Sequence, residues 1–315
     1  MEINCVIDGK YEGMQIQSVL RHEFFMSNTA VKKCKLYGEV DLNGEHAFVK
    51  APVHSGDLLH VKYDDDTEIS HDNDIRFYFE NSNYAVVEKP AGMVTHPTHG
   101  HLDDSLLTIL NAGDKPLHPV MRLDRETSGL IIVAKNGYAH NTLHKFGNIE
   151  KRYLAVVYGC FSPLEGTIDK PIARRANSVM IREINPDGRR CVTHYKTLLT
   201  DKSNEISLVE FKLDTGRCHQ IRVHSNSMGH PLVGDGLYGP NSEDNPRECK
   251  GIFGHSKELD GLVGRTALHA YSLRFEDPMD SGRTHEYISP PPEDMLKVFD
   301  GESRQRIDQM FCEGH

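Results

Sequence analysis

The sequence has no long hydrophobic run. None of its apolar stretches approaches the ~20 residues that a transmembrane helix needs. The first residues, MEINCVIDGKYEG, carry acidic side chains instead of the basic-then-apolar order of a signal peptide. We therefore expect a cytoplasmic protein with no membrane partner. A chain of 315 residues with ordinary charged and apolar fractions can form one sizeable domain and one small domain.

Closely spaced cysteine pairs are also absent. The seven cysteines are an odd number, lie far apart and include no Cys-x-x-Cys pair, which argues against a zinc site and against a disulfide framework. His219, His224 and His230 follow one another at spacings that do not fit the three-to-four-residue step of one helical face. We therefore expect no metal and no cofactor.

Basic side chains are fewer than acidic ones. Lys and Arg number 36 against 46 Asp and Glu, which gives a formal net charge of −10. That charge is unfavourable for a protein that binds nucleic acid phosphates, but the distribution of charge matters more than its sum. The basic residues gather in clusters at 21, 32–35, 122–125, 151–152, 174–175 and 217–222. Several of these clusters coincide with the motifs described below.

Residues 1–63 have the pattern of a separate, small α+β module. Apolar residues at helical spacing predict a helix that begins after residue 13. Residues 27–36 (SNTAVKKCKL) predict a second helix, which opens on a capping residue and carries a basic face. Asn43-Gly44 is typical of a β-hairpin turn, and residues 53–61 predict the closing strand. This order resembles the ribosomal-protein-S-four-like RNA-binding domain; the alternative is a generic α+β accessory domain.

The acidic, apolar-poor run 64–74 predicts an exposed linker. Residues 75–315 then predict a second α+β domain. Its strand candidates are not separated by regular crossover helices, which argues against a doubly wound parallel fold and favours a largely antiparallel sheet. These candidates are 85–88, 130–134, 153–158, 193–199 and 207–213. The Gly-rich stretch 240–264 predicts a surface insertion, and residues 293–299 predict a helix in the C-terminal tail.

The stretch 120–135, VMRLDRETSGLIIVAK, combines two kinds of structure. Residues 130–134 are an unbroken apolar run, as expected of a buried strand. Residues 122–129 before it carry two arginines and Asp124, and a rigid strand would hold this carboxylate still at the rim of a cleft. The alternative is a solvated turn.

Three further stretches accompany this one: 86–97 (VVEKPAGMVTHP), 151–159 (KRYLAVVYG) and 213–239 (LDTGRCHQIRVHSNSMGHPLVGDGLYG). In this order the four stretches resemble the RluA/RluD-type family of RNA pseudouridine synthases, from about residue 75 to about residue 275. Four separate motifs are more specific than one short pattern. The resemblance implies a mixed sheet split by a catalytic cleft.

The resemblance also implies roles for individual side chains. Asp124 would be the catalytic carboxylate, and Arg222 would pair with it and keep it ionised. Tyr153 would stack on the uracil and move a proton. Arg122 would fill the space that a flipped uridine leaves in the RNA. The RNA-binding set would be Arg122, Arg217, His219, Lys32, Lys33 and Lys35.

Two positions depart from the family pattern. Met121 stands where the family usually has a histidine, and Cys218 where it usually has threonine or serine. The first departure puts fine positioning of the substrate in doubt but not the reaction, and we expect no loss of chemistry from the second.

Three classes of function compete. The leading one is an RNA isomerase, expected to be a monomer. The two-domain layout favours large-subunit ribosomal RNA as its partner, with tRNA as the alternative. The second is a nucleoside hydrolase or glycosylase that uses Asp124 and releases free base. The third is a non-catalytic RNA-binding protein, against which the intact Asp124, Tyr153 and Arg222 argue.

Overall fold

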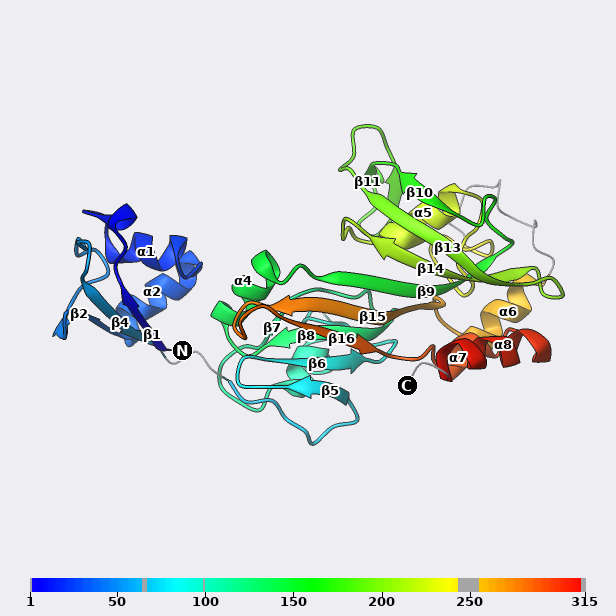
Figure 1. Ribbon diagram of the computed structural model, residues 1–315. Coiled ribbons are helices and arrows are strands. Elements are labelled where there is room, and N and C mark those ends of the chain that lie inside the picture. Colours follow the sequence, from blue (N-terminus) through cyan, green and yellow to red (C-terminus); the bar gives the residue numbers. More distant parts are fainter. Residues whose placement is uncertain (1, 64–66, 99, 243–254, 313–315) are drawn as a thin grey trace.

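The computed structural model describes residues 2–63, 67–98, 100–242 and 255–312. Its first unit is a four-stranded antiparallel sheet with two helices (Figure 1). The strands, in the order β1-β4-β2-β3, and the helices are β1 (Glu2–Val6), β2 (Glu39–Leu42), β3 (Glu45–His46), β4 (Leu58–Lys62), the 3-10 turn η1 (Gly9–Tyr11), α1 (Ile16–His22) and α2 (Asn28–Tyr37).

In the first unit, the short sequence patterns form the local structures that were predicted from them. Ser27 caps α2 by accepting a hydrogen bond from the Ala30 amide. Asn43 and Gly44 both have positive φ, as the tight turn between β2 and β3 requires. Apolar residues of α1 and α2 share one core with those of β4. Both expected helices and the hairpin are therefore present.

The larger domain is built on one sheet of ten strands. Their order is β10-β13-β14-β9-β15-β8-β6-β5, with β16 beside β15 and β7 beside β8. Among the described strands only β15 and β8 pair in parallel, so the prediction of a mixed, largely antiparallel sheet is confirmed. The strands are β5 (Arg76–Glu80), β6 (Tyr84–Lys89), β7 (His118–Pro119), β8 (Ser128–Ala134), β9 (Glu150–Tyr158), β10 (Glu165–Asp169), β13 (Val192–Asp201), β14 (Ile206–Leu213), β15 (Leu268–Asp277) and β16 (Arg283–Ile288).

A short separate hairpin and several helices complete the domain. The hairpin pairs β11 (Ile172–Arg174) with β12 (Arg182–Ile184). The helices are α3 (Leu106–Leu110), α4 (Gly137–Phe146), α5 (Gln220–Ser227), α6 (Ser256–Val263), α7 (Glu293–Leu296) and α8 (Gly301–Cys312). None of the helices in the described part of the chain is long and apolar enough to cross a bilayer.

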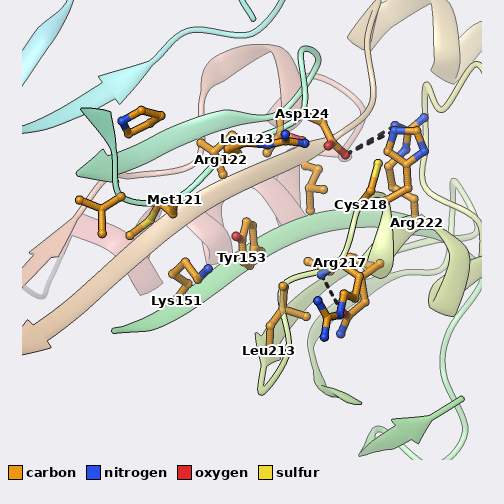
Figure 2. A pocket seen from close by; sticks show the side chains of 18 of the residues that line it. Met121, Arg122, Leu123, Asp124, Lys151, Tyr153, Leu213, Arg217, Cys218 and Arg222 are labelled. Atoms are coloured by element: carbon orange, nitrogen blue, oxygen red, sulfur yellow. Dashed lines mark hydrogen bonds and ion pairs between the residues drawn. The ribbon is translucent and has the colours of Figure 1, made fainter. Parts of the chain in front are cut away.

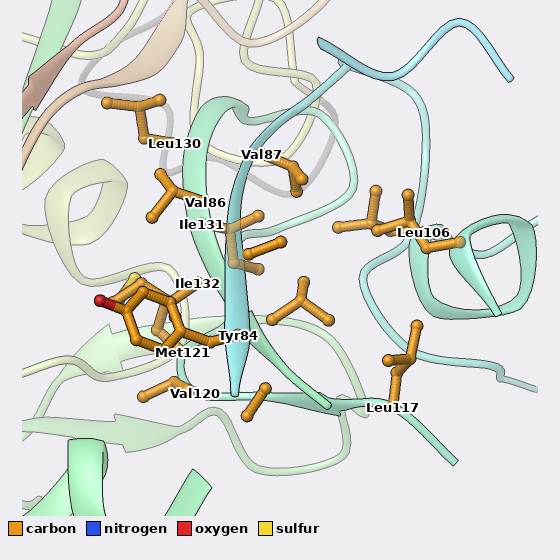
Figure 3. Close-up of a cluster of buried hydrophobic side chains, with 14 of the residues drawn as sticks. Tyr84, Val86, Val87, Leu106, Leu117, Val120, Met121, Leu130, Ile131 and Ile132 are labelled. Atoms are coloured by element: carbon orange, nitrogen blue, oxygen red, sulfur yellow. The ribbon is translucent and has the colours of Figure 1, made fainter. Parts of the chain in front are cut away.

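The β8 strand lies in the centre of one apolar core. All seven of its residues are buried. Figure 3 shows Ile132 on the same side of the strands as Tyr84 and Val86 of the neighbouring strand β6, and Ile131 on the other side with Val87. At Gly129 φ is +115°, and a β-carbon there would lie 2.3 Å from the Ala270 carbonyl oxygen. The close approach of β8 to β15 therefore requires glycine at this position.

Alternation along β9 decides which side chains reach the cleft. Leu154, Val156 and Tyr158 belong to the core that also holds residues of α6, α7 and α8. Tyr153 points to the opposite face of the sheet and joins the second cluster of this region. Because successive side chains of a strand point to opposite faces, this register places Tyr153 on the side of the cleft.

Three expectations need correction. Residues 67–70 are not an exposed linker: Thr67 and Ile69 are buried, and the Ser70 amide donates to the Leu110 carbonyl at 2.8 Å. The second half of the expected surface insertion forms α6, whose Leu259 and Val263 lie in the core. The tail contains α8 in addition to the predicted helix. Residues 64–66 and 243–254 of the first two predictions lie outside the described residues.

The two units meet at the C-terminal end of α4. The rings of Phe25 and Phe146 have centroids 4.4 Å apart, and the Lys145 ammonium lies 4.8 Å from the centroid of the Phe25 ring. This contact joins the first unit to a helix of the larger domain.

Candidate active site

Asp124 lies in the loop between β7 and β8, and a buried lysine holds this loop in place. The Lys89 ammonium is fully buried and donates to the carbonyls of Pro90 and Met93 at 2.7 Å and of Arg125 at 3.1 Å. Burial, and then the charge of Arg265, lowers the pKa of Lys89 to about 7, while the three carbonyl acceptors favour its ammonium form. Through Lys89, the turn that follows β6 is therefore also an internal clamp on the Asp124 loop.

Arg265 supports the same loop from the other side. Its guanidinium donates to the Glu126 carbonyl at 3.2 Å and pairs with Asp294 at the start of α7 through bonds of 2.5 and 2.9 Å. The C-terminal helix is thereby tied to the Asp124 loop. Arg265 was not predicted from the sequence, because its partners lie 29 and 139 positions away along the chain.

The Asp124 side chain is 27% exposed and faces two basic groups. Its Oδ2 atom lies 3.8 Å from Nη1 of Arg222 and 3.9 Å from Nε2 of His219. These separations exceed hydrogen-bond length, so the Asp124 oxygens keep their capacity to accept bonds from a ligand. The structure thus brings together Asp124 and the arginine that the resemblance assigns to it.

The stronger partner of Arg222 is Asp235, which was not predicted from the sequence. Nε and Nη2 of Arg222 donate to the two oxygens of Asp235 at 2.7 and 2.6 Å, and both side chains are buried. Burial lowers the pKa of Arg222, but the Asp235 hydrogen bonds and charge outweigh this and raise it overall. The guanidinium therefore stays cationic beside Asp124. The sequence feature that could have indicated Asp235 is the Gly-Asp-Gly sequence at 234–236, but this sequence is also typical of an ordinary turn.

His219 enters the cleft from a constrained backbone. It precedes α5 with a φ of +58°, in the left-handed region that few residues other than glycine adopt. Its Nδ1 lies 2.8 Å from the Tyr238 hydroxyl. Burial lowers the pKa of His219, although the negative charge of Asp124 acts in the opposite direction. At neutral pH the side chain is therefore an uncharged polar group that faces the carboxylate.

Tyr153 lines the same cavity as Asp124 and is only 6% exposed. Figure 2 shows its ring between the end of the cavity formed by Met121 and Lys151 and the end formed by Asp124 and Arg222. Burial, together with the negative charge of Asp124, raises the pKa of Tyr153. Its hydroxyl is therefore a neutral phenol throughout the physiological range.

Two hollows meet at Asp124 and form one cleft. The first has a volume of about 540 Å³ and the second of about 630 Å³. Arg122 is exposed and lines both. The residues that the two hollows share are Arg122, Leu123, Asp124, Cys218, His219 and Arg222. Asp124 therefore stands at the middle of a groove whose rim is largely cationic.

Of the remaining residues singled out from the sequence, some line the cleft and others lie outside it. Arg217 is exposed and lines the first hollow, as does Met121. On α2, Lys32 and Lys35 are exposed and Lys33 is half-buried, but the structure does not bring these lysines into either hollow.

The other two histidines considered as metal ligands are bonded elsewhere. His224 contacts Thr193 and the Lys170 carbonyl, and His230 contacts the Tyr158 carbonyl. Among the residues that the structure describes, neither shares a potential metal site with His219.

One trio in the described part of the chain has the spacing of metal ligands. Ligand atoms of Asp124, Cys218 and His219 all lie within 4.8 Å of one another. The Arg222 guanidinium, 3.8 Å from the same carboxylate oxygen, repels a cation there. Burial and the Asp124 charge also raise the pKa of the Cys218 thiol. This trio is therefore better suited to hold polar groups of a substrate than a metal ion.

Fold and site define a protein in which Asp124 stands where two hollows meet, close to the basic side chains Arg122 and Arg222. Comparison with known proteins gives the family. Residues 83–227 match the family model described as RNA pseudouridylate synthase. An uncharacterized RNA pseudouridine synthase of Bacillus subtilis, YjbO, is 34% identical over 84% of this chain and 91% of its own length. Ribosomal large subunit pseudouridine synthase D of Vibrio cholerae is 31% identical over 95% of this chain and 94% of its own.

Among solved structures, human RNA pseudouridylate synthase domain containing 4 has the same fold. It superimposes with a TM-score of 0.53 at 24% identity, over 71% of this chain and 92% of the human chain. The chain belongs to the RluA/RluD-type family of RNA pseudouridine synthases. It is an isomerase that acts on RNA.

Proposed function

We propose that Asp124 is the catalytic carboxylate with which this enzyme converts specific uridines of large-subunit ribosomal RNA to pseudouridine. One observation carries the assignment to Asp124. Among the described residues that line the first hollow it is the only carboxylate, and it stands where this hollow joins the second. Its partial exposure leaves its oxygens accessible to a bound nucleotide, while the buried Arg222 guanidinium faces it at 3.8 Å.

The reaction breaks the C–N glycosidic bond, turns the uracil and forms a C–C bond. No atom is gained or lost, so the isomerisation requires no oxidant, reductant or co-substrate. Asp124 acts either as a nucleophile toward the sugar or as the base that removes a sugar proton. The neutral hydroxyl of Tyr153 supplies the group that moves the proton released from the uracil when the new bond has formed, and its ring is the stacking platform.

The target base must leave its helix before Asp124 can reach it. Flipping costs a few kcal/mol of stacking and pairing energy. Arg122 is exposed, lies two positions before Asp124 in the chain, and lines both hollows. A guanidinium in this place enters the space that the flipped base leaves and offsets part of that energy.

Two observations support ribosomal RNA as the substrate. Relatives that match nearly the full chain bear names that assign them to the large ribosomal subunit. The first unit presents exposed Lys32 and Lys35 on α2, which supports its role as an S-four-like RNA-binding domain. Lysines of this kind contact phosphates and add affinity for structured RNA without reading its sequence.

The test is a map of pseudouridine in cells with and without the gene. We expect the loss of modification at one or a few uridines of large-subunit RNA, restored by the wild-type gene. Loss confined to tRNA would assign the substrate to tRNA instead. Release of free uracil by the purified enzyme, without pseudouridine in the RNA, would contradict isomerisation and indicate a glycosylase.

A further inference from the structure

A third hollow lies beside the cleft, against the β11–β12 hairpin. Its volume is about 430 Å³, and it meets the first hollow at Arg217 and Cys218, which line both. The other residues that line it are Ile172, Ala173, Arg174, Arg182, Asp187, Gly188 and Arg189. Among the described residues, four arginines and a single carboxylate therefore surround a space that opens next to the catalytic groove.

The arginines of this hollow differ from their neighbours in the way they are paired. Arg190 and Arg175, close by in the chain, form ion pairs with Asp169 at 3.0 Å and with Glu183 at 3.1 Å. Within the described part of the chain, the guanidinium groups of Arg174, Arg189 and Arg217 have no carboxylate partner. In a protein with a formal net charge of −10, acidic partners are not scarce. The unpaired charge is therefore a local property of the hollow.

Strand register places two of these charges opposite each other. Arg174 on β11 is the direct cross-strand partner of Arg182 on β12. Like charges in this position destabilise a sheet, and each of these strands has only three residues. Arg182 donates to carbonyls of the hairpin loop, among them that of Val179 at 3.2 Å. Those bonds shape the loop but do not neutralise the charge. Folding alone does not account for this pair.

The backbone beneath Arg189 is firmly held. Its amide and carbonyl both bond to Ile172, each at 2.9 Å. A β-carbon at Gly188 would lie 2.5 Å from the Ile172 carbonyl carbon, so glycine is needed to bring the chain this close to β11. Arg189 is therefore presented from a fixed backbone position, although its side chain is exposed.

We propose that Arg174, Arg189 and Arg217 form a subsite for a backbone phosphate of the RNA, adjacent to the target nucleotide. Guanidinium groups bind phosphate through paired, charge-assisted hydrogen bonds. Because this hollow meets the groove at Cys218, beside His219 and Asp124, a phosphate held there fixes the position of the strand relative to Asp124. Such a contact sets register without reading a base. This inference rests on the proposed function in that its ligand is RNA.

The experiment measures the affinity of the full chain for a labelled oligouridylate over a series of salt concentrations. Arg189→Ala and Arg174→Ala each remove one proposed phosphate ligand. We expect each to weaken binding at low salt by roughly three- to tenfold and to make the slope of log affinity against log salt shallower by about 0.7. Arg189→Lys keeps the charge and should restore most of the slope. Arg190→Ala is the matched control, and its affinity should stay within about twofold of wild type.

The outcomes separate this inference from the proposed function. If wild type binds the oligouridylate but Arg189→Ala and Arg190→Ala behave alike, the subsite is wrong and the RNA-modifying function is untouched. If wild type does not bind RNA, both fail. Inorganic phosphate in competition identifies the source of the anion. Loss of phosphate binding in Arg189→Ala, with unchanged affinity for the oligouridylate, would assign the hollow to a free anion and overturn the RNA subsite.

Discussion

The surroundings of Asp124 and the surfaces proposed to hold the RNA backbone are built in opposite ways. Around Asp124 the polar groups are buried and paired: Lys89 has three carbonyl partners, and Arg222 has Asp235. Beside the β11–β12 hairpin Arg189 is exposed, and on α2 Lys32 is exposed. Chemistry requires groups held in place before the substrate arrives, whereas phosphate contacts require mainly charge. Substitutions in the two regions should therefore differ in size and in kind.

The largest effect after that of the carboxylate itself is expected at Tyr153. Tyr153→Phe keeps the ring but removes the hydroxyl. If the hydroxyl moves a proton, the single-turnover rate should fall by about 10²–10⁴-fold, while RNA affinity stays within roughly tenfold. Normal turnover in this variant would reduce the tyrosine to a stacking platform.

The raised pKa of Tyr153 adds a test by pH. A tyrosine with the ordinary pKa of about 10 would lose its proton, and with it the activity, as the pH approaches that value. Because burial and the Asp124 charge raise the pKa of this hydroxyl, the neutral form persists to higher pH. We expect the wild-type rate to show no loss from this group up to about pH 10. A decline governed by the Tyr153 hydroxyl well below that pH would contradict the assignment.

The next largest effect is expected when the buried ion pair between Arg222 and Asp235 is broken. Asp235→Asn leaves the Arg222 charge without its closest partner, and breaking a buried pair in this way typically costs about 3–5 kcal/mol of unfolding free energy. Urea denaturation measures this loss, and single-turnover assays should show a slower reaction because Arg222 is no longer held beside Asp124.

Asp169→Asn provides the matched control, because Asp169 and Arg190 form an exposed pair at 3.0 Å. Exposed pairs contribute about 0–1 kcal/mol. Equal losses of stability in the two variants would show that the buried pair has no special role.

The smallest effect is expected from substitutions of the lysines on α2, and it concerns RNA affinity. Lys32→Ala and Lys35→Ala together should lower RNA affinity modestly and make its salt dependence shallower, by about 0.7 in slope for each phosphate that the protein no longer neutralises. Removal of residues 1–63 should do the same more strongly. Lys10→Ala is the control within the same unit, because Lys10 pairs with Glu23 at 2.9 Å. An unchanged salt slope in both the double variant and the truncated protein would contradict the RNA-binding role of this unit.

Local patterns predicted much of this architecture. The cap at Ser27, the Asn43-Gly44 turn and the apolar run of β8 each specify structure within a few residues. The parts that escaped prediction depend on contacts between distant segments. Asp235 matters because α5 brings Arg222 to it. Ser303 and Ile307 are buried residues that anchor α8, and so sparse an apolar pattern does not stand out in the sequence.

In the candidate site, too, the sequence predicted some features, and the others depend on contacts between distant segments. Motifs located Asp124, Tyr153 and Arg222 in the chain, and the structure brings all three to one hollow. The distances, the clamp by Lys89 and the support from Arg265 arise only from tertiary packing. No spacing in the sequence predicts that a guanidinium at position 265 will bond to the carbonyl of residue 126.

The most direct test of the role of Asp124 is single-turnover release of tritium from carbon five of labelled uridine in RNA, with enzyme in excess. Asp124→Asn is nearly isosteric but removes the negative charge that the reaction needs as nucleophile, base or stabiliser. Glu126→Gln makes the same change two positions away, on a side chain that also lines the second hollow. We predict no detectable release from Asp124→Asn, a loss of several powers of ten, with near-normal RNA binding, and most of the wild-type rate from Glu126→Gln. Comparable release from wild type and Asp124→Asn would contradict the central claim and place the chemistry on another residue.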